Sequence, residues 1–422
     1  MQHRKDYGQY LRNLFFIELN TDINSFCRVG NEENEQYLLT RLPKEDFATF
    51  VHEYMHFLLN ITTTSGLNRF NMYSKYLQLY IYTAYEKYDD EILCPIFLED
   101  TGVDNAAEAA DVNSFYYGMG ANGSKKIHHI NKITLEKEEI IQDNLPAGTV
   151  NICIYYDDKT TPYYFGADCI EESIAYLVES EKFGAKKRNN ELPYNACELV
   201  TKYFCKKIVD QKNIIVTLAE LSLLHYHPGQ MFVEFLKHIE TNDKVFHNSR
   251  GLIDYYKETI EVHLQNYGKE ITESEECIDF MYPQFEPFER INIWLKEVRD
   301  KGKEQRKEKL ALIGPMIELP ENKCKLYLYE LIKIMGYPAI SDNNHMIYSS
   351  EENISLVLVP GAIREAFNGK KKCFMYEYCI ANNMSQISDL CLEEPWSQNT
   401  QCPFSLFWQH YSLSDKKIIS RN

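Results

Sequence analysis

The sequence predicts an α+β protein that is mainly helical. Residues 13–42 contain apolar or alternating runs separated by a polar turn, which is the pattern of β-strands. From residue 194 to residue 300, apolar residues instead recur at three- and four-residue spacing over several stretches, as in amphipathic helices. We therefore expect an N-terminal β-sheet, an early amphipathic helix and a helical C-terminal half.

The size and composition are those of a globular protein with a large core. The chain has 422 residues, of which 44% are hydrophobic and 25% charged. We expect the main domain to cover residues 1–300, with a loop or lid insertion at 100–150. Residues 301–422 are then a C-terminal α/β extension packed on that core.

The charge excludes some classes of partner. A net charge of −17 argues against nucleic acid and against anionic lipid surfaces, because both attract basic proteins. No apolar segment follows Met1, and no run of about 18 apolar residues is present. We expect a cytoplasmic protein without a nucleic-acid or membrane partner.

The first helix is expected to begin near Pro43, after candidate strands at 14–19 and 37–42. Its middle carries the sequence His52-Glu53-Tyr54-Met55-His56. Because histidines four residues apart share one helix face, both imidazoles can reach one metal ion. Glu53 lies beside that face, where a carboxylate can act on water near the metal. The alternative is a helix with two incidental histidines.

A third metal ligand is expected on a later helix over residues 168–181. A catalytic zinc ion usually has three protein ligands and one open position. Glu171 and Glu172 lie on this largely apolar helix, among small residues that allow close packing against the first helix. Either carboxylate is a candidate ligand, and a solvated pair of glutamates is the alternative.

These two segments resemble the gluzincin branch of the zincin metallopeptidases, over residues 40–65 and 160–182. Glu172-Ser173-Ile174-Ala175 matches the family's pattern around its third ligand, whereas Glu171 matches less well. The resemblance implies a zincin-like catalytic core that binds Zn²⁺ through His52, His56 and Glu172. It also implies peptide hydrolysis with Glu53 as general base. Tyr176 stands where the thermolysin-like pattern has an Asp that orients one histidine.

The rest of the chain is expected to be mainly helical. A hairpin is predicted from 150–156 and 162–165, and a strand at 354–359. The predicted helices cover residues 71–88, 195–209, 214–226, 229–240, 251–267, 285–300, 322–336 and 360–367. The highly charged run 296–309 is either a solvated helix or a domain boundary.

A hydrogen-bond donor for the transition state is expected near the metal. Tyr164 and His225 are our candidates, with Tyr163, Tyr226 and His227 as further possibilities. For His225 the alternative is a role in capping the end of a helix, where a cation is favourable.

Two further features need an interpretation. The glycines between Gly118 and Gly123 formally match a dinucleotide fingerprint, but no strand leads into them, so we interpret them as a loop. Four cysteines in the last fifty residues lack the paired spacing typical of zinc knuckles, so we expect buried thiols rather than a structural zinc site. These cysteines are Cys373, Cys379, Cys391 and Cys402.

Three functions are consistent with these patterns. The first is a zinc endopeptidase that cleaves a protein substrate, acting in defence or regulation and restrained by a regulatory protein partner. The second is a catalytically inactive zincin-fold protein that acts as a binding or regulatory module. The third is a helical interaction module without zinc. Metal content separates the third hypothesis from the other two, and the activity of a Glu53 variant separates the first from the second.

Overall fold

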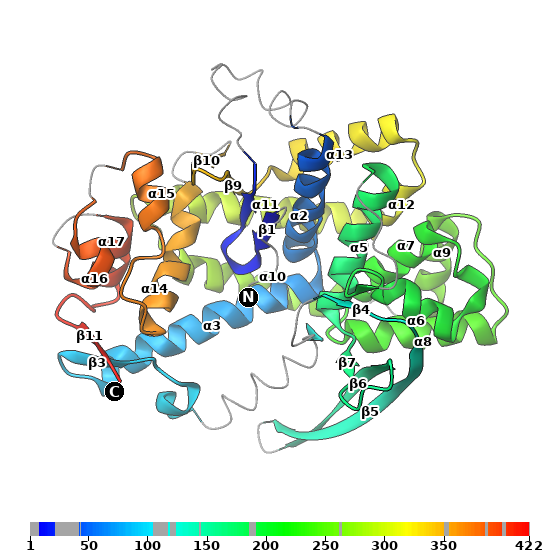
Figure 1. Ribbon diagram of the computed structural model, residues 1–422, viewed down its shortest axis with the longest axis horizontal. Helices are drawn as coiled ribbons and strands as arrows, with labels where there is room; N and C mark the ends of the chain where they lie inside the picture. Colours follow the sequence, from blue (N-terminus) through cyan, green and yellow to red (C-terminus); the bar gives the residue numbers. More distant parts are fainter. Residues whose placement is uncertain are drawn as a thin grey trace.

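The structure confirms the mainly helical α+β class (Figure 1). It is a computed structural model. Its described residues are 8–21, 42, 44–103, 117–118, 124–142, 145–184, 191–260, 264–349, 354–384, 387–398 and 402–421. The predicted strand at 37–42 and residues 119–123 of the glycine-rich segment lie outside these ranges, except for Leu42.

The predicted first helix is present as α2 (Lys44–Thr62), which is buried from Phe47 to its end. After a short break at Thr63 the chain continues as α3 (Thr64–Lys87), which begins earlier than the predicted 71–88. The Thr63 side chain caps α3 by accepting a hydrogen bond from the amide of Gly66 (3.0 Å). In both ribbon views α10 (Leu264–Met281) runs alongside α3.

The helix expected at 168–181 is α5 (Ala167–Lys182), and it packs directly against α2. Apolar residues recur along its buried face, which explains why it lies in the core. The helices packed on α5 are α6 (Ala196–Phe204), α7 (Lys212–Ser222), α8 (Pro228–Thr241) and α12 (Gly314–Ile317). The helix α5 is therefore held by α2 and by these four further helices.

The expected N-terminal sheet combines strands from the N-terminal part of the chain with strands from the segment after residue 301. Its order is β1-β2-β9-β10. The strands β1 (Gly8–Leu11) and β2 (Phe16–Leu19) are antiparallel, and β9 (Ala339–Ser341) pairs with β2 in parallel. The strand β10 (Ile347–Tyr348) completes the sheet. The segment after residue 301 is thus joined to the N-terminal part by backbone hydrogen bonds.

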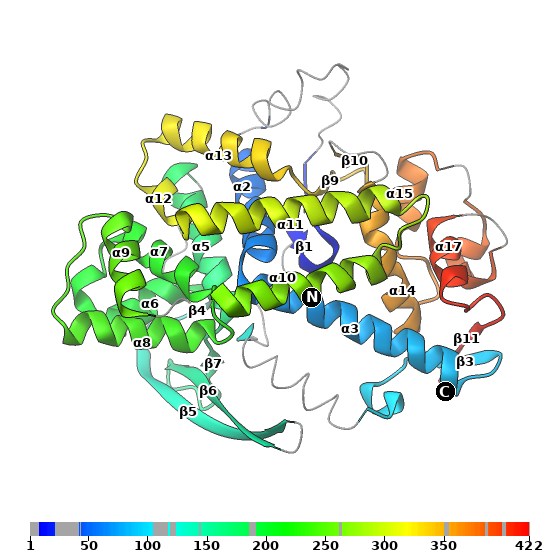
Figure 2. The same ribbon diagram turned by 180° about the vertical axis from the view of Figure 1, so that it is seen from behind.

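A long hairpin occupies much of the segment that was expected to be a loop. It consists of β5 (Ile130–Gln142) and β6 (Leu145–Tyr156), and β7 (Tyr163–Tyr164) adds a third antiparallel strand. In Figures 1 and 2 it extends away from the helices. The predicted β6–β7 hairpin is therefore confirmed, whereas β5 was not expected. Two smaller sheets pair β4 (Lys125–Lys126) with β8 (Glu191–Leu192), and β3 (Glu91–Cys94) with β11 (Lys417–Ser420).

Two predictions on secondary structure are wrong. The segment expected as a strand at 354–359 is a 3₁₀ helix, Ile354–Leu358, which leads directly into α14 (Val359–Phe367). The single helix expected at 251–267 is broken, because α9 (Ser249–Thr259) ends at Ile260 in an extended conformation before α10 begins.

The remaining predicted helices are present. The charged run 296–309 belongs to α11 (Glu289–Lys309), a continuous helix that contains residue 300, and α13 (Glu321–Met335) follows it. Before β11, the C-terminal segment contains the short helices α15 (Tyr376–Ala381), α16 (Leu390–Glu393) and α17 (Pro403–His410). In the described part of the chain, no helix combines the length and apolar character needed to cross a membrane.

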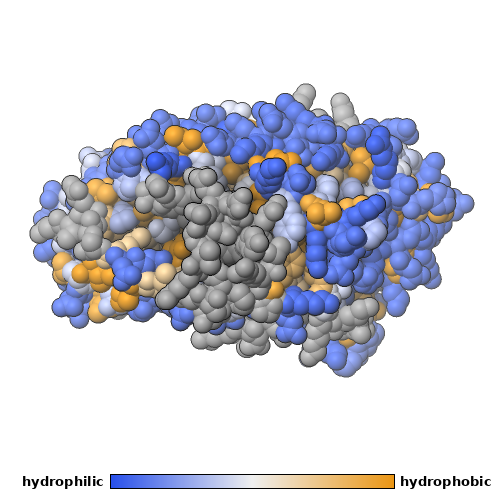
Figure 3. Space-filling view, turned by 90° about the horizontal axis from the view of Figure 1, so that it is seen from above, coloured by the Kyte–Doolittle hydropathy of each residue, from blue (hydrophilic) through white to orange (hydrophobic). Residues whose placement is uncertain are grey.

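The surface seen in Figure 3 is hydrophilic over most of its described area. Hydrophobic side chains gather mainly at its left end, where Figure 1 places the C-terminal helices. Exposed apolar residues of this segment include Ile380, Ile387, Leu390 and Leu392.

One fully buried ion pair connects four helices of the core. The side chains of Arg306 on α11 and Glu220 on α7 are 2.5 Å apart and are 1% and 0% exposed. Arg306 also donates to the carbonyl oxygen of Thr62 (3.0 Å), at the end of α2. Glu220 accepts hydrogen bonds from the amides of Leu312 and Ile313, which precede α12, and of Gly314, its first residue (2.7–2.9 Å). Because both charges are fully hydrogen-bonded, their burial is tolerated.

Removing one partner of this pair should destabilise the protein strongly. We expect Arg306→Met to lower the free energy of unfolding by about 3–5 kcal/mol, because it leaves the Glu220 carboxylate buried without its counter-charge. Urea denaturation followed by circular dichroism measures this change. The matched control is Lys325→Ala, which breaks an exposed pair with Glu321 (2.9 Å) and should change stability by less than about 0.5 kcal/mol. Equal effects of the two substitutions would contradict the structural role of Arg306.

Candidate metal centre

The structure brings His52, His56 and Glu172 together where α2 packs against α5. One nitrogen of each imidazole and one carboxylate oxygen all lie within 4.8 Å of one another. The carboxylate is 3.4 Å from His52 Nε2 and 3.6 Å from His56 Nε2. Two imidazoles and one carboxylate are the protein ligands of many catalytic zinc sites.

The burial of the two imidazoles and their lack of hydrogen bonds at Nε2 to any described residue support metal binding. His52 and His56 are 5% and 2% exposed, yet neither Nε2 atom makes a hydrogen bond within the described part of the chain. Buried polar atoms without hydrogen bonds are costly and are rare in native proteins. A metal ion bound by both nitrogens would remove this cost, so the residues present fit such an ion.

The two histidines have opposite electrostatic environments. Burial lowers the pKa of His56 to about 3, against the attraction of Glu172, so this imidazole is neutral at physiological pH. Burial also acts to lower the pKa of His52, but Glu172 and Glu179 outweigh it and raise that pKa to about 9. Because a metal ligand must be a neutral imidazole, a cation bound here would replace a proton of His52.

Glu179 orients His52, and sequence reasoning missed it. Its carboxylate accepts a hydrogen bond from His52 Nδ1 (3.0 Å), so Nε2 is turned toward Glu172. Glu172 and Glu179 are seven residues apart on α5, two helical turns, and therefore lie on the same face. A carboxylate on the far nitrogen of a ligand histidine is the usual second layer of a metal site. The thermolysin-like pattern has an Asp at the position of Tyr176. Here Tyr176 packs against Tyr194.

Glu171, the other candidate ligand, has different partners. It forms ion pairs with Arg69 (3.1 Å) and Arg12 (3.5 Å). One of its oxygens is also 3.9 Å from His56 Nδ1, the nitrogen that faces away from Glu172. Glu171 thus lies behind His56, while Glu172 lies between the two histidines. This geometry favours Glu172 as the third ligand.

Two arginines anchor the beginning of α5. Arg69 on α3 pairs with Asp168 (2.7 Å), and Arg12, in the 3₁₀ turn Arg12–Leu14, pairs with Asp168 as well. Arg12 is also 3.4 Å from Glu172, and its side chain is 22% exposed. The arginine charges offset the repulsion among three acidic residues that lie close together on α5.

The first turn of α5 is also enclosed by two glycines. A Cβ atom at Gly118 would lie 2.2 Å from the backbone nitrogen of Gly166, and Gly118 has a φ of +63°. A Cβ atom at Gly229 would lie 2.4 Å from the carbonyl oxygen of Phe165. Both distances are too short for any side chain, so the backbone at this end of α5 requires glycine at both positions.

The candidate donor Tyr164 lies on β7, next to α5. Its backbone carbonyl accepts a hydrogen bond from the Cys169 thiol (3.4 Å). Neighbouring residues of a strand point to opposite faces, and it is Tyr163 whose phenol is within electrostatic reach of Glu172. Burial is the largest cause that raises the pKa of Tyr163, and Glu172 adds to it. The ring of Tyr194 is 6.4 Å from that of His52. Tyr163 and Tyr194 are therefore further candidate donors.

His225 follows the end of α7 and is buried. Its Nε2 atom shares a hydrogen bond with the hydroxyl of Tyr256 on α9. That contact joins α7 to α9 and has a structural role. The assignment of His225 as a catalytic donor stays a prediction.

Comparisons with known proteins identify no relative. No protein-family model, no curated protein and no solved structure matches the chain. The candidate metal centre therefore rests on its own geometry.

Replacing the proposed third ligand should abolish metal binding. We expect Glu172→Gln to lower zinc content well below one equivalent, because the isosteric amide cannot supply a charged ligand. The matched variant Glu171→Gln should retain about one equivalent, since Glu171 faces the other nitrogen of His56. Inductively coupled plasma mass spectrometry of the purified proteins measures both, with circular dichroism to verify folding. The opposite ranking of the two variants would reassign the ligand.

The orienting carboxylate gives a second prediction. We expect Glu179→Ala to weaken zinc affinity about 10- to 100-fold while leaving a fully loaded site attainable, because the ligand itself is retained. Competition with a chelating dye measures the affinity. Glu181→Ala is the control, since Glu181 lies on the same helix but pairs with Lys212 (2.7 Å). A change of less than threefold for Glu179→Ala would remove its proposed role.

Proposed function

We propose that this protein is a zinc-dependent peptidase with a gluzincin-like catalytic core, which hydrolyses a peptide bond of a protein substrate. The observation that carries the proposal is the convergence of His52, His56 and Glu172 within 4.8 Å, with Glu53 next to the first ligand on α2. Two histidines and a glutamate on two packed helices are the ligand set expected from the sequence resemblance.

The chemistry assigned to the chain's own residues is proton transfer and orientation. A zinc ion held by the three ligands would supply a Lewis acid that acidifies water and polarises a carbonyl group. Glu53 is buried (3% exposed) and close enough to His52 to raise its pKa. In the proposed mechanism the Glu53 carboxylate accepts the proton of the attacking water and returns it to the leaving amine. Glu179 keeps His52 in the tautomer that presents Nε2.

The alternative is a catalytically inactive protein that uses the same scaffold for binding or regulation. Both functions require the metal ligands, but only the peptidase requires a proton acceptor at Glu53. A cytoplasmic peptidase would also need restraint by a narrow substrate choice or by a regulatory protein partner. We favour the peptidase because the motif has a glutamate between its two histidines. A purely structural metal site would not need this carboxylate.

Glu53→Gln separates the two functions. We expect this variant to keep about one equivalent of zinc and to lose at least about 100-fold in cleavage rate, because the amide cannot accept a proton. The assay incubates full-length, zinc-loaded protein with a complex peptide mixture and counts new peptide termini by mass spectrometry. Removal of zinc by a chelator should abolish cleavage by the wild type, and added zinc should restore it.

The control variant is Glu181→Gln, which changes an exposed glutamate on α5 and should leave cleavage unchanged. If the wild type and Glu53→Gln produce the same termini at the same rate, the peptidase proposal is wrong. Stoichiometric zinc in both proteins without cleavage of any peptide would favour the binding module.

A further inference from the structure

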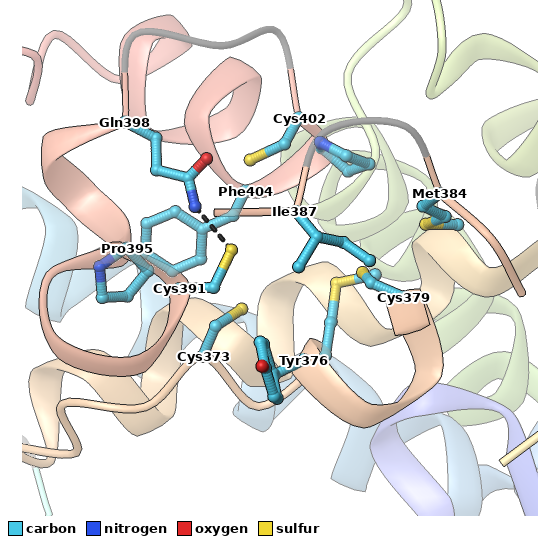
Figure 4. A pocket seen from close by; sticks show the side chains of 12 residues that line it. Cys373, Tyr376, Cys379, Met384, Ile387, Cys391, Pro395, Gln398, Cys402 and Phe404 are labelled. Atoms are coloured by element: carbon cyan, nitrogen blue, oxygen red, sulfur yellow. Dashed lines mark hydrogen bonds between the residues drawn. The ribbon is translucent and has the colours of Figure 1, made fainter. Parts of the chain in front are cut away.

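Four cysteines of the C-terminal segment line one pocket (Figure 4). Cys373 precedes α15, Cys379 lies on α15, Cys391 lies on α16, and Cys402 is the N-cap residue of α17. The fold therefore brings together thiols from four successive segments of the chain, although their spacing in the sequence is irregular. None of the four forms a disulfide bond.

The four sulfur atoms line a cavity and do not converge on the position of a single ion. In a site with a single zinc ion, each Zn–S bond is about 2.3 Å long, so any two sulfurs lie within about 4.6 Å. In the described part of the chain, which includes all four cysteines, no three of these sulfurs lie within 4.8 Å of one another. The cavity between them measures about 40 Å³, counted as the space open to the centre of a water molecule. This exceeds the roughly 10–15 Å³ that one water needs on the same measure.

Three of the sulfurs receive N–H donors. The Gln398 side chain donates to Cys391 Sγ (2.6 Å), and the Ser405 amide donates to Cys402 Sγ (3.3 Å). The amide of Met375 donates to Cys373. A thiol sulfur is a weak acceptor, whereas a thiolate is a strong one, so these donors favour the ionised form. N–H donors to sulfur are also a main way in which proteins tune iron–sulfur clusters.

The surroundings of Cys373 and Cys379 disfavour a nucleophilic thiolate at these two positions. Burial, with a smaller contribution from the neighbouring cysteines, raises the pKa of both thiols to about 12. The other residues that line the pocket are largely apolar and include Met375, Ile387, Pro395 and Phe404. A thiophilic metal is a partner that would ionise several neighbouring thiols together.

We propose that Cys373, Cys379, Cys391 and Cys402 are thiolate ligands of an iron–sulfur cluster. Four cysteine thiolates are the ligand set of both the two-iron and the four-iron cluster. The separation of the sulfurs favours such a multi-atom cluster over a single zinc ion. The site is independent of the metal centre at α2 and α5, because it shares no residue with it.

The test is the metal and sulfide content of the full-length protein purified without oxygen. We expect iron and acid-labile sulfide in equal amounts, about two or four of each per chain, with the visible absorption of a cluster. Cys379→Ser and Cys391→Ser should each lose at least half of the iron and sulfide. The matched control is Cys324→Ser, which changes a buried thiol on α13 and should retain both.

Three results would overturn the proposal. One is a second equivalent of zinc without iron or sulfide, which would indicate a single-ion site. Another is the absence of any metal that depends on these cysteines, including after incubation of the wild type with iron and sulfide. A third is equal retention of iron by the Cys379 and Cys324 variants. If the serine variants fail to fold, the sulfide content of the wild type still decides. His52→Ala should lose zinc and keep iron, so failure of the peptidase proposal would be seen separately.

Discussion

The buried pair of Arg306 and Glu220 fixes the framework on which the metal centre depends. Burying two charges costs several kcal/mol per ion, and only complete hydrogen bonding offsets that cost. Here Arg306 donates to the last carbonyl of α2, and Glu220 accepts the amides at the start of α12, groups that no helix can satisfy internally. The end of α2 is therefore held in one position relative to α7, and α7 packs on α5. The two histidines and Glu172 meet because both of their helices are positioned by this core.

Within that framework, the candidate metal centre is asymmetric. His52 donates a hydrogen bond from Nδ1 to the carboxylate of Glu179, whereas the far nitrogen of His56 only faces Glu171 at 3.9 Å. Arg12 and Arg69 neutralise the acidic side of α5. Glu172 is the most exposed of the three candidate ligands, with a side chain that is 11% exposed. The candidate centre is therefore more exposed on the side of α5 than on the side of α2.

Sequence reasoning predicted the elements that follow strong local patterns and missed those that depend on the tertiary fold. The helix with His52 and His56 was predicted because its apolar spacing continues for four turns. The prediction of a strand at 354–359 was wrong, since a short apolar run fits a buried strand or a buried turn equally well. The strand β5 was missed because its sequence places charged residues on both faces, and among residues 130–137 only Ile133 is buried. Glu179 was missed because the family pattern directed attention to Tyr176, one turn too early. The gathering of four cysteines is a product of tertiary folding that their spacing does not reveal.

The contact of Gly118 and Gly229 with the start of α5 has a consequence for how this protein can evolve. Neither glycine belongs to the ligand set, yet a methyl group at either position would push the backbone at Phe165 and Gly166 and shift the helix that carries Glu172. We therefore expect a side chain at either position to disturb the candidate metal centre as much as loss of one of its histidines. A selection for variants that lose metal binding would then recover these two glycines beside the histidines.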